Sequence, residues 1–228
     1  RAKITFRTDH LSYYIMSIAS NLKLITSSIP SNVTLVAVSK TKTNADILIA
    51  HNAGQIIFGE NKVQELEKKH KELPSDIQWH MIGHLQTNKV KYIAPFVSLI
   101  HAIDSIKLLK EINKRAKQNN RTIDCLLQVH IAEEATKFGF RINEIEKVIE
   151  RSKEFKNINI AGIMAMATFT DNAKQINKEF ASINELFESI RTKDINTLSI
   201  GMSNDYKLAI DNGSNMIRVG SAIFGNRN

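Results

Sequence analysis

Short apolar runs rich in β-branched residues recur about every 20 to 30 residues along the chain, as strands do when helices connect them. Between these runs lie stretches with helical periodicity or helix-forming composition. The pattern predicts eight strands, at residues 34–39, 55–58, 78–82, 97–102, 123–131, 158–164, 197–200 and 216–219. Strands that alternate with helices form parallel sheets, and eight of them indicate a closed (β/α)₈ TIM barrel rather than an open sheet.

Two of the connecting stretches have the clearest helical periodicity. From Asp171 onward, apolar residues recur at steps of four, three, four and three, which places on one helix face Ile176, Phe180, Ile183, Phe187 and Ile190. Ser105 is a good N-cap for a second helix, whose inner face is expected to contain Leu109, Ile112 and Ala116. Both apolar faces are expected to pack against the sheet.

An additional helix is expected before the first strand, over about residues 11–24. Its apolar residues form a stripe that should pack against the flank of the barrel, made of Leu11, Ile15, Ile18 and Leu22. The predicted fold is therefore an α/β barrel with an extra N-terminal helix.

Composition fits one domain over residues 1–228. A chain of 228 residues with 43% hydrophobic residues forms one substantial core, and no interdomain linker is visible. The only cysteine, Cys125, excludes an intrachain disulfide and lies in an apolar run, where we expect it to be buried. No run approaches the roughly 18 apolar residues of a membrane helix, and no signal-peptide pattern is present. We therefore expect a cytoplasmic protein without membrane contact.

The net charge of +8 is compatible with a nucleic-acid partner. However, the lysines are spread along the chain and mixed with glutamates on predicted helices, as on an ordinary solvated surface. The sequence also lacks zinc-finger spacing, an aromatic stacking surface and a helix-turn-helix signal. We therefore expect no nucleic-acid site.

Candidate chemistry begins at Lys40, which follows the apolar run of the first strand at its carboxyl end. One interpretation is a solvated strand-end lysine, which is the commoner situation for this feature alone. The other is an amine that condenses with an aldehyde. This needs a neutral amine, and because the reference pKa of lysine is about 10.4, burial or a nearby cation must lower the pKa.

Small and hydroxylated residues gather around the seventh and eighth predicted strands, in residues 201–205 and 218–225. Small side chains let backbone N–H groups approach an anion, and Ser203 and Ser221 add hydroxyl donors. A helix expected to begin near Ser203 would direct its positive end to the same place. Glycine and serine are also ordinary turn residues. Phosphate often binds at these loops of barrels, so the pattern by itself leaves two alternatives, an anion site and ordinary turns.

Five sequence blocks follow one another in order: VAVSK at 36–40, FGENKVQE at 58–65, WHMIGHLQTNK at 79–89, GMSND at 201–205 and RVGSAIFG at 218–225. Together they resemble the YggS/PROSC family of pyridoxal 5′-phosphate (PLP)-binding proteins, which share their barrel with the N-terminal domain of bacterial alanine racemase. The resemblance extends from the first strand to Asn228. It implies an alanine racemase N-terminal domain-like barrel with PLP as its cofactor.

The resemblance also implies roles for individual residues. Lys40 is the Schiff-base lysine that holds PLP covalently. The cofactor phosphate is assigned to Ser203, Gly220 and Ser221, and Arg218 faces the pyridine nitrogen. A guanidinium group only donates hydrogen bonds, so that nitrogen must be an unprotonated acceptor, which makes the ring a weaker electron sink. This disfavours transaminase-like chemistry and agrees with racemase-like or purely binding roles. The alternative for Arg218 is an ordinary surface arginine.

Three further positions match the family less specifically. Asn61 corresponds to a residue that lines the cofactor, and it can also act as N-cap of the helix that continues from Val63. Met164 lies in a block similar to the family's sixth strand end, where it packs on the cofactor side or fills a gap in the core. Lys137 matches a lysine in the loop after the fifth strand. It either relays PLP or is a solvated loop lysine.

His80 and His84 have the spacing of a helical metal-binding pair. His80 falls in a predicted strand and His84 just beyond it, so the two do not share a helix face. We therefore expect no metal site. Either histidine is instead a candidate for a place near the cofactor, as part of the barrel rim.

Two functions remain open: a carrier that serves intracellular PLP homeostasis, and a PLP-dependent amino-acid racemase. Racemisation needs an acid/base on each face of the substrate carbanion. In alanine racemases the second group is a tyrosine from an extra C-terminal domain across a dimer interface, and this sequence ends three residues after Gly225. Its tyrosines fall in predicted helices, at Tyr13, Tyr14, Tyr92 and Tyr206. We therefore expect a non-catalytic monomer that supplies or buffers PLP, with PLP-dependent apo-enzymes as recipients.

Overall fold

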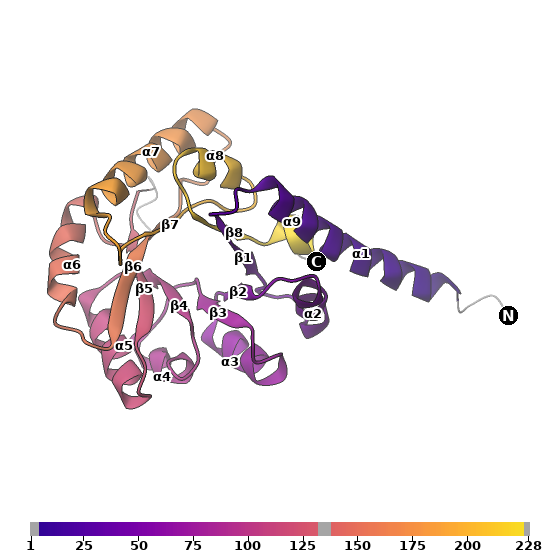
Figure 1. Cartoon of the computed structure of the whole chain (residues 1–228), viewed down its shortest axis with the longest axis horizontal. Coiled ribbons are helices and arrows are strands. Elements are labelled where there is room, and N and C mark those ends of the chain that lie inside the picture. The colour runs from indigo at the N-terminus through magenta and orange to yellow at the C-terminus, as the bar shows by residue number, and fades with distance from the viewer. Residues whose placement is uncertain (1–4, 132–137, 226–228) are drawn as a thin grey trace.

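The computed structural model describes residues 5–131 and 138–225, with side chains from Ser17 onward in the first helix. Across these residues, eight parallel strands close into a barrel (Figure 1). The strands follow chain order, and β8 pairs with β1 to complete the closure. They are β1 Thr34–Val38, β2 Ile57–Glu60, β3 Gln78–Met81, β4 Leu99–Ile103, β5 Ile123–Val129, β6 Ile158–Ala165, β7 Thr197–Ser199 and β8 Met216–Val219. The predicted (β/α)₈ barrel is confirmed.

Helices surround the barrel and connect successive strands (Figure 1). In the described chain they are α1 Thr5–Ser28, α2 Asn44–Asn52, α3 Val63–Glu72, α4 Val90–Ile93, α5 Ile106–Gln118, α6 Ile145–Ser152, α7 Ala173–Ile190, α8 Tyr206–Asp211 and α9 Ser221–Phe224. Short 3₁₀ turns at Thr87–Lys89 and Ile142–Glu144 precede α4 and α6. None of the described helices is both long and apolar enough to cross a membrane.

The helices expected from periodicity are confirmed. The hydroxyl oxygen of Ser105 accepts a hydrogen bond from the Leu108 N–H at 3.3 Å, so that Ser105 caps α5 as predicted. The predicted inner face of α5 is fully buried, comprising Leu109, Ile112 and Ala116. α7 begins after Asn172, and its buried side chains include Phe180, Ile183, Phe187 and Ile190. Local spacing therefore identified the faces that pack against the sheet.

The predicted strand bounds differ from the observed ones by up to two residues. The largest shift concerns β2, expected at 55–58 and found at Ile57–Glu60. Gln55 is buried, but its side-chain amide donates to the carbonyl oxygens of Leu35 and Ile57, at 2.9 and 2.6 Å. The Gln55 side chain thus connects the backbones of β1 and β2 instead of belonging to β2. Its position in an apolar run does not indicate this role.

α1 is longer than the predicted helix and packs mainly on other helices. Its buried residues Ile18 and Leu22 belong to the stripe expected at the barrel flank. The neighbours of α1 are α2 and α9, and the Asn21 side chain donates to the carbonyl oxygen of Ile223 at 3.1 Å. The side chains of Leu11 and Ile15 lie outside the described residues.

Buried apolar side chains form two clusters, as alternation along barrel strands requires. The larger cluster joins the outer faces of the strands to the helices, and it includes Ala37 and Cys125. The smaller cluster combines residues of five strands that face the barrel interior: Val36, Leu99, Ala102, Leu126, Met164 and Met216. Cys125 is fully buried as expected. Part of the barrel interior is therefore apolar.

Candidate cofactor site

Lys40 lies two residues beyond the end of β1 and is half-buried. Val36 faces the barrel interior and Ala37 faces the helices. Because side chains alternate along a strand, Lys40 is on the same face as Val36, at the mouth of the barrel. The structure thus places the lysine where the carboxyl ends of the strands meet, as the sequence predicted.

The segments after β7 and β8 meet beside the end of β1. The Gly220 N–H donates to the hydroxyl oxygen of Ser203 at 3.1 Å, and Ser221 follows at the start of α9, where it is exposed. A Cβ atom on Gly220 would lie 3.1 Å from the carbonyl oxygen of Val38. Gly220 therefore packs closely on β1, and the hydrogen bond between Gly220 and Ser203 joins the two segments into what we call the cradle.

The helix expected near Ser203 begins three residues later. α8 starts at Tyr206 after the N-cap Asp205, whose carboxylate accepts a hydrogen bond from the Met202 N–H at 2.5 Å. The regular helix thus continues a turn around Ser203 in which the N–H groups of Asp205 and Tyr206 donate to the carbonyl oxygen of Met202. The Asp205 carboxylate supports this turn by the side-chain bond of a capping box.

Arg218 is buried in the barrel, with 4% of its surface exposed. Its Nη1 donates to both the carbonyl and the hydroxyl oxygens of Ser199, each at 2.7 Å, and its Nη2 donates to the carbonyl oxygen of Ala165 at 3.1 Å. Burial lowers the pKa of Arg218 to about 10, and the charge of Asp205 opposes this shift. The guanidinium group therefore stays charged at neutral pH. The alternative of an ordinary surface arginine is wrong.

Arg218 is one end of a hydrogen-bonded chain across the barrel interior. The hydroxyl oxygen of Ser199 lies 3.3 Å from Nδ1 of His101, and Nε2 of His101 lies 3.0 Å from Nδ1 of His80. The guanidinium group can only donate, so Ser199 accepts from it. A hydroxyl group has one donor and two acceptor sites, so the direction of the Ser199–His101 and His101–His80 bonds depends on the tautomer of His101. The four residues come from β8, β7, β4 and β3, and all are buried.

The two histidines of this hydrogen-bonded chain, His80 and His101, are neutral at neutral pH. Burial lowers the pKa of His80 to about 3. Burial, followed by the influence of His80 and Arg218, holds the pKa of His101 well below its ordinary value. The expectation that His80 lies at the barrel rim is wrong, since its ring faces the interior and pairs with His101. The one sequence signal for these hydrogen-bonded residues was the presence of His101 within the apolar run 99–103.

Two other predicted residues occupy different settings. Met164 is 1% exposed and belongs to the interior cluster. Asn61 is half-buried after β2, and its carbonyl oxygen lies so near Gly83 that a Cβ there would approach it to 2.4 Å. The N-cap of α3 is Lys62, with no side-chain cap bond, so the capping role considered for Asn61 is wrong.

The model of the alanine racemase N-terminal domain family matches residues 15–228 of the chain. The chain belongs to this family. Among curated relatives, the pyridoxal phosphate homeostasis protein of Aquifex aeolicus is 37% identical over 198 residues, covering 85% of this chain and 86% of the relative. The protein of the same name from Schizosaccharomyces pombe is 36% identical over 221 residues, covering 92% and 93%. The predicted family resemblance is confirmed.

Solved structures of the alanine racemase N-terminal domain family have the same barrel. PipY of Synechococcus elongatus with PLP bound has a TM-score of 0.82 and 32% identity, and it aligns over 91% of this chain and 100% of its own. The structure of PipY without PLP has a TM-score of 0.87. Alanine racemase from E. faecalis has a TM-score of 0.76 at 14% identity and aligns over 58% of its own chain. This last likeness concerns the fold alone.

His84 lies three residues beyond the end of β3. Nδ1 of His84 pairs with Asp104 at 3.0 Å, and its ring stacks on Phe138 with centroids 4.3 Å apart. His84 and His80 therefore have separate partners. In the part of the chain that the structure describes, no group of three His, Cys, Asp or Glu side chains is arranged to hold a metal ion. Lys137 lies outside the described residues.

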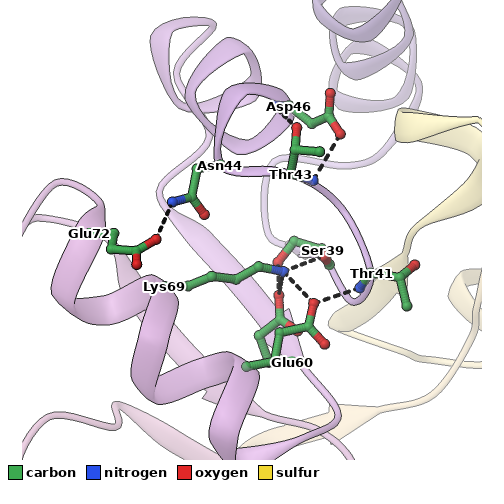
Figure 2. A network of polar contacts seen from close by, with 9 residues as sticks. Ser39, Thr41, Thr43, Asn44, Asp46, Glu60, Lys69 and Glu72 are labelled. Atoms are coloured by element: carbon green, nitrogen blue, oxygen red, sulfur yellow. Dashed lines mark hydrogen bonds and ion pairs between the residues drawn. The ribbon is translucent and has the colours of Figure 1, made fainter.

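A polar network behind Lys40, on the outer side of the barrel, went unnoticed in the sequence. The Ser39 hydroxyl donates to Glu60 at 2.6 Å, and the ammonium group of Lys69 donates to Glu60 at 2.7 Å (Figure 2). Burial raises the pKa of Glu60, and Lys69 and Ser39 oppose this shift. Glu60 belongs to a recognised sequence block, but Lys69 lies in a run of charged helix residues without any distinguishing signal.

Proposed function

We propose that this chain binds PLP and serves intracellular PLP homeostasis, holding the cofactor covalently at Lys40. The observation that carries the proposal is the position of Lys40 at the barrel mouth, next to the cradle formed by Ser203 and Gly220. Relatives with the name pyridoxal phosphate homeostasis protein and the PLP-bound structure of PipY support it.

PLP supplies an aldehyde, a phosphate and a pyridine nitrogen, and the chain offers a complementary group for each. Hydroxyl groups and backbone N–H groups are the donors that bind anions, and Ser203 and Ser221 supply hydroxyl groups here. We assign the phosphate to Ser203, Gly220 and Ser221. The charged guanidinium of Arg218 donates to the pyridine nitrogen, and the three groups it already contacts hold it in place.

The covalent step uses the Lys40 amine. The neutral amine donates its lone pair to the aldehyde carbon, a proton passes from nitrogen to oxygen, and one water molecule leaves as the C=N bond forms. Asn61, half-buried after β2, donates from its amide to the ring substituents. Met164 belongs to the interior cluster, and we assign it to the wall of the cofactor pocket.

We favour a carrier without a dedicated turnover over an amino-acid racemase. Racemisation needs a second acid/base opposite Lys40. Of the tyrosines whose side chains the structure describes, Tyr206 packs with the outer core cluster and Tyr92 is exposed on α4. Both positions are on the outer side of the barrel, away from the interior face on which Lys40 lies.

We further propose that residues 1–228 act as one monomeric cytoplasmic domain that passes PLP to apo-enzymes. Light scattering of the PLP-loaded protein at several concentrations measures the monomer, and a mass that doubles with concentration refutes it. Transfer is measured by the activity that a PLP-dependent apo-enzyme regains from the loaded protein. Recovery no faster than with an equal amount of free PLP contradicts a delivery role.

The covalent attachment is tested by borohydride reduction of the PLP-loaded protein, followed by peptide mass mapping. We expect one modified residue, Lys40, and a yellow protein before reduction. Lys40→Ala should remain folded and lose the absorption band. Lys62→Ala is the matched control, because Lys62 is exposed and its side chain does not cap α3. A colourless wild-type protein in excess PLP, or modification elsewhere, refutes the proposal.

The racemase alternative is tested with single-enantiomer amino acids in D₂O. A carrier should leave their optical rotation and α-hydrogen unchanged over hours. Rapid α-deuteration with loss of optical activity, absent in Lys40→Ala, would establish turnover instead.

A further inference from the structure

Side chains of α3 hold both peptide groups that flank Lys40. The carbonyl oxygen of Ser39 accepts a hydrogen bond from the ammonium group of Lys69 at 2.8 Å (Figure 2). The N–H of Thr41 donates to the carboxylate of Glu65 at 2.7 Å. These are the carbonyl of the peptide before Lys40 and the N–H of the peptide after it. The Cα atom of Lys40 therefore lies between two tethered peptide planes.

Lys69 connects the two tethers. Its Nζ donates to Ser39, to Glu60 and to Glu65, at 2.8, 2.7 and 2.7 Å, and these three bonds use all the donors of an ammonium group. The Lys69 side chain is 6% exposed and that of Glu60 is 0% exposed. Desolvation makes buried ion pairs a poor source of stability. A site that needs a fixed geometry explains the buried ion pair of Lys69 and Glu60 better than a gain in stability does.

The backbone after Lys40 is strained. Thr41 has a φ of +66°, in the left-handed region that β-branched residues avoid. The bond from its N–H to Glu65 stabilises this conformation. Strained backbone of this kind persists only where the surrounding structure holds it in place, and it is common at ligand sites.

We propose that Lys69 is a positioning residue that directs the Lys40 side chain into the barrel mouth. Ser39 and Lys40 face opposite sides of the strand, so contacts from α3 to the outer side fix the direction of Lys40 on the inner side. Lys69 acts through the Ser39 carbonyl and through Glu65, and it does not touch the cofactor. The inference rests on the proposed covalent role of Lys40 and adds the element that orients it.

The test compares variants on a single helix. Lys69→Met removes the three hydrogen bonds that the Lys69 ammonium group donates, and Lys69→Arg restores a cation. Glu65→Gln keeps the shape of the side chain but removes the charge that the Thr41 N–H binds. Lys71→Met is the matched control, because Lys71 forms an exposed ion pair with Glu67 on the same helix.

Two quantities are measured for each variant: the rate at which the covalent absorption band forms after PLP addition, and total bound PLP by equilibrium dialysis. Lys69→Met and Glu65→Gln should slow covalent attachment about tenfold or more, since small misplacements of a reacting group have effects of this size. Total bound PLP at saturating concentration should change little. Lys69→Arg should recover part of the rate, and Lys71→Met should equal the wild type.

Attachment at the wild-type rate in Lys69→Met and Glu65→Gln overturns the inference. So does a slower rate that is matched by an equal loss of total binding and of thermal stability, because that pattern indicates a merely structural role. If Lys69→Met does not fold, Glu65→Gln decides by the same two measurements. A wild-type protein that never forms the band refutes the proposed function itself, and this outcome is visible before any variant is compared.

Discussion

Acid should unfold this protein through its buried histidine pair. The folded-state pKa of His80 is about 3, and that of His101 is also far below the ordinary value of 6.5. Below pH 6.5 the unfolded chain therefore binds protons that the folded chain does not. The stability that these neutral rings contribute is complete above that pH and is lost as the pH falls toward the folded-state values.

The size of the effect follows from the shifts. Between about pH 7 and about pH 5, each histidine that stays neutral only in the folded state lowers the free energy of unfolding by about 2 kcal/mol. The pair should therefore account for about 4 kcal/mol. Urea unfolding followed by circular dichroism at several pH values measures the free energy directly.

His101→Asn isolates one of the two contributions. The asparagine amide can keep the contact to Ser199, but it is too short to reach His80 and it does not titrate. We expect the loss of stability on acidification to be smaller by about 2 kcal/mol than in the wild type. His51→Asn serves as control, since His51 lies on α2 and pairs with Asp76 outside the barrel interior. Equal acid sensitivity of His101→Asn and the wild type would refute the reasoning.

Three further predictions concern the interior and the cradle. Ser199→Ala removes a hydrogen bond to the charged Arg218 and should lower the free energy of unfolding by about 2–3 kcal/mol. Ser189→Ala, at an exposed position, should have almost no effect. Similar urea midpoints for the two variants would contradict this prediction. Gly220→Ala places a methyl group 3.1 Å from a β1 carbonyl oxygen and should weaken PLP binding about tenfold in equilibrium dialysis, so unchanged affinity would argue against the cradle. Burial raises the pKa of the Cys125 thiol, so iodoacetamide should label Cys125 only after denaturation, and rapid labelling of native protein would show that this core is open.

The barrel was predictable because each of its strands and helices depends on residues that lie close together in the sequence. Apolar spacing defined the buried face of α5 and its cap at Ser105. The carboxyl end of β1 was equally visible, so Lys40 could be placed at the barrel mouth. The start of α8 was expected near Ser203 and lies three residues later, after a turn closed by backbone bonds to the Met202 carbonyl oxygen.

The partners of the polar residues were not predictable in the same way. Lys68 and Lys69 are adjacent lysines on one helix, yet the first is exposed and the second is buried against Ser39. His80 and His101 lie on different strands, and nothing in their local sequences indicates that their rings meet.

The sequence by itself determined the order of strands and helices, the apolar faces and the family of this chain, since each depends on residues close together or on blocks in order. Only the tertiary structure decided which polar side chains share the interior and which hold the backbone of Lys40. Closure of the barrel sets the register of β3, β4, β7 and β8, and that register brings distant donors and acceptors within hydrogen-bonding distance.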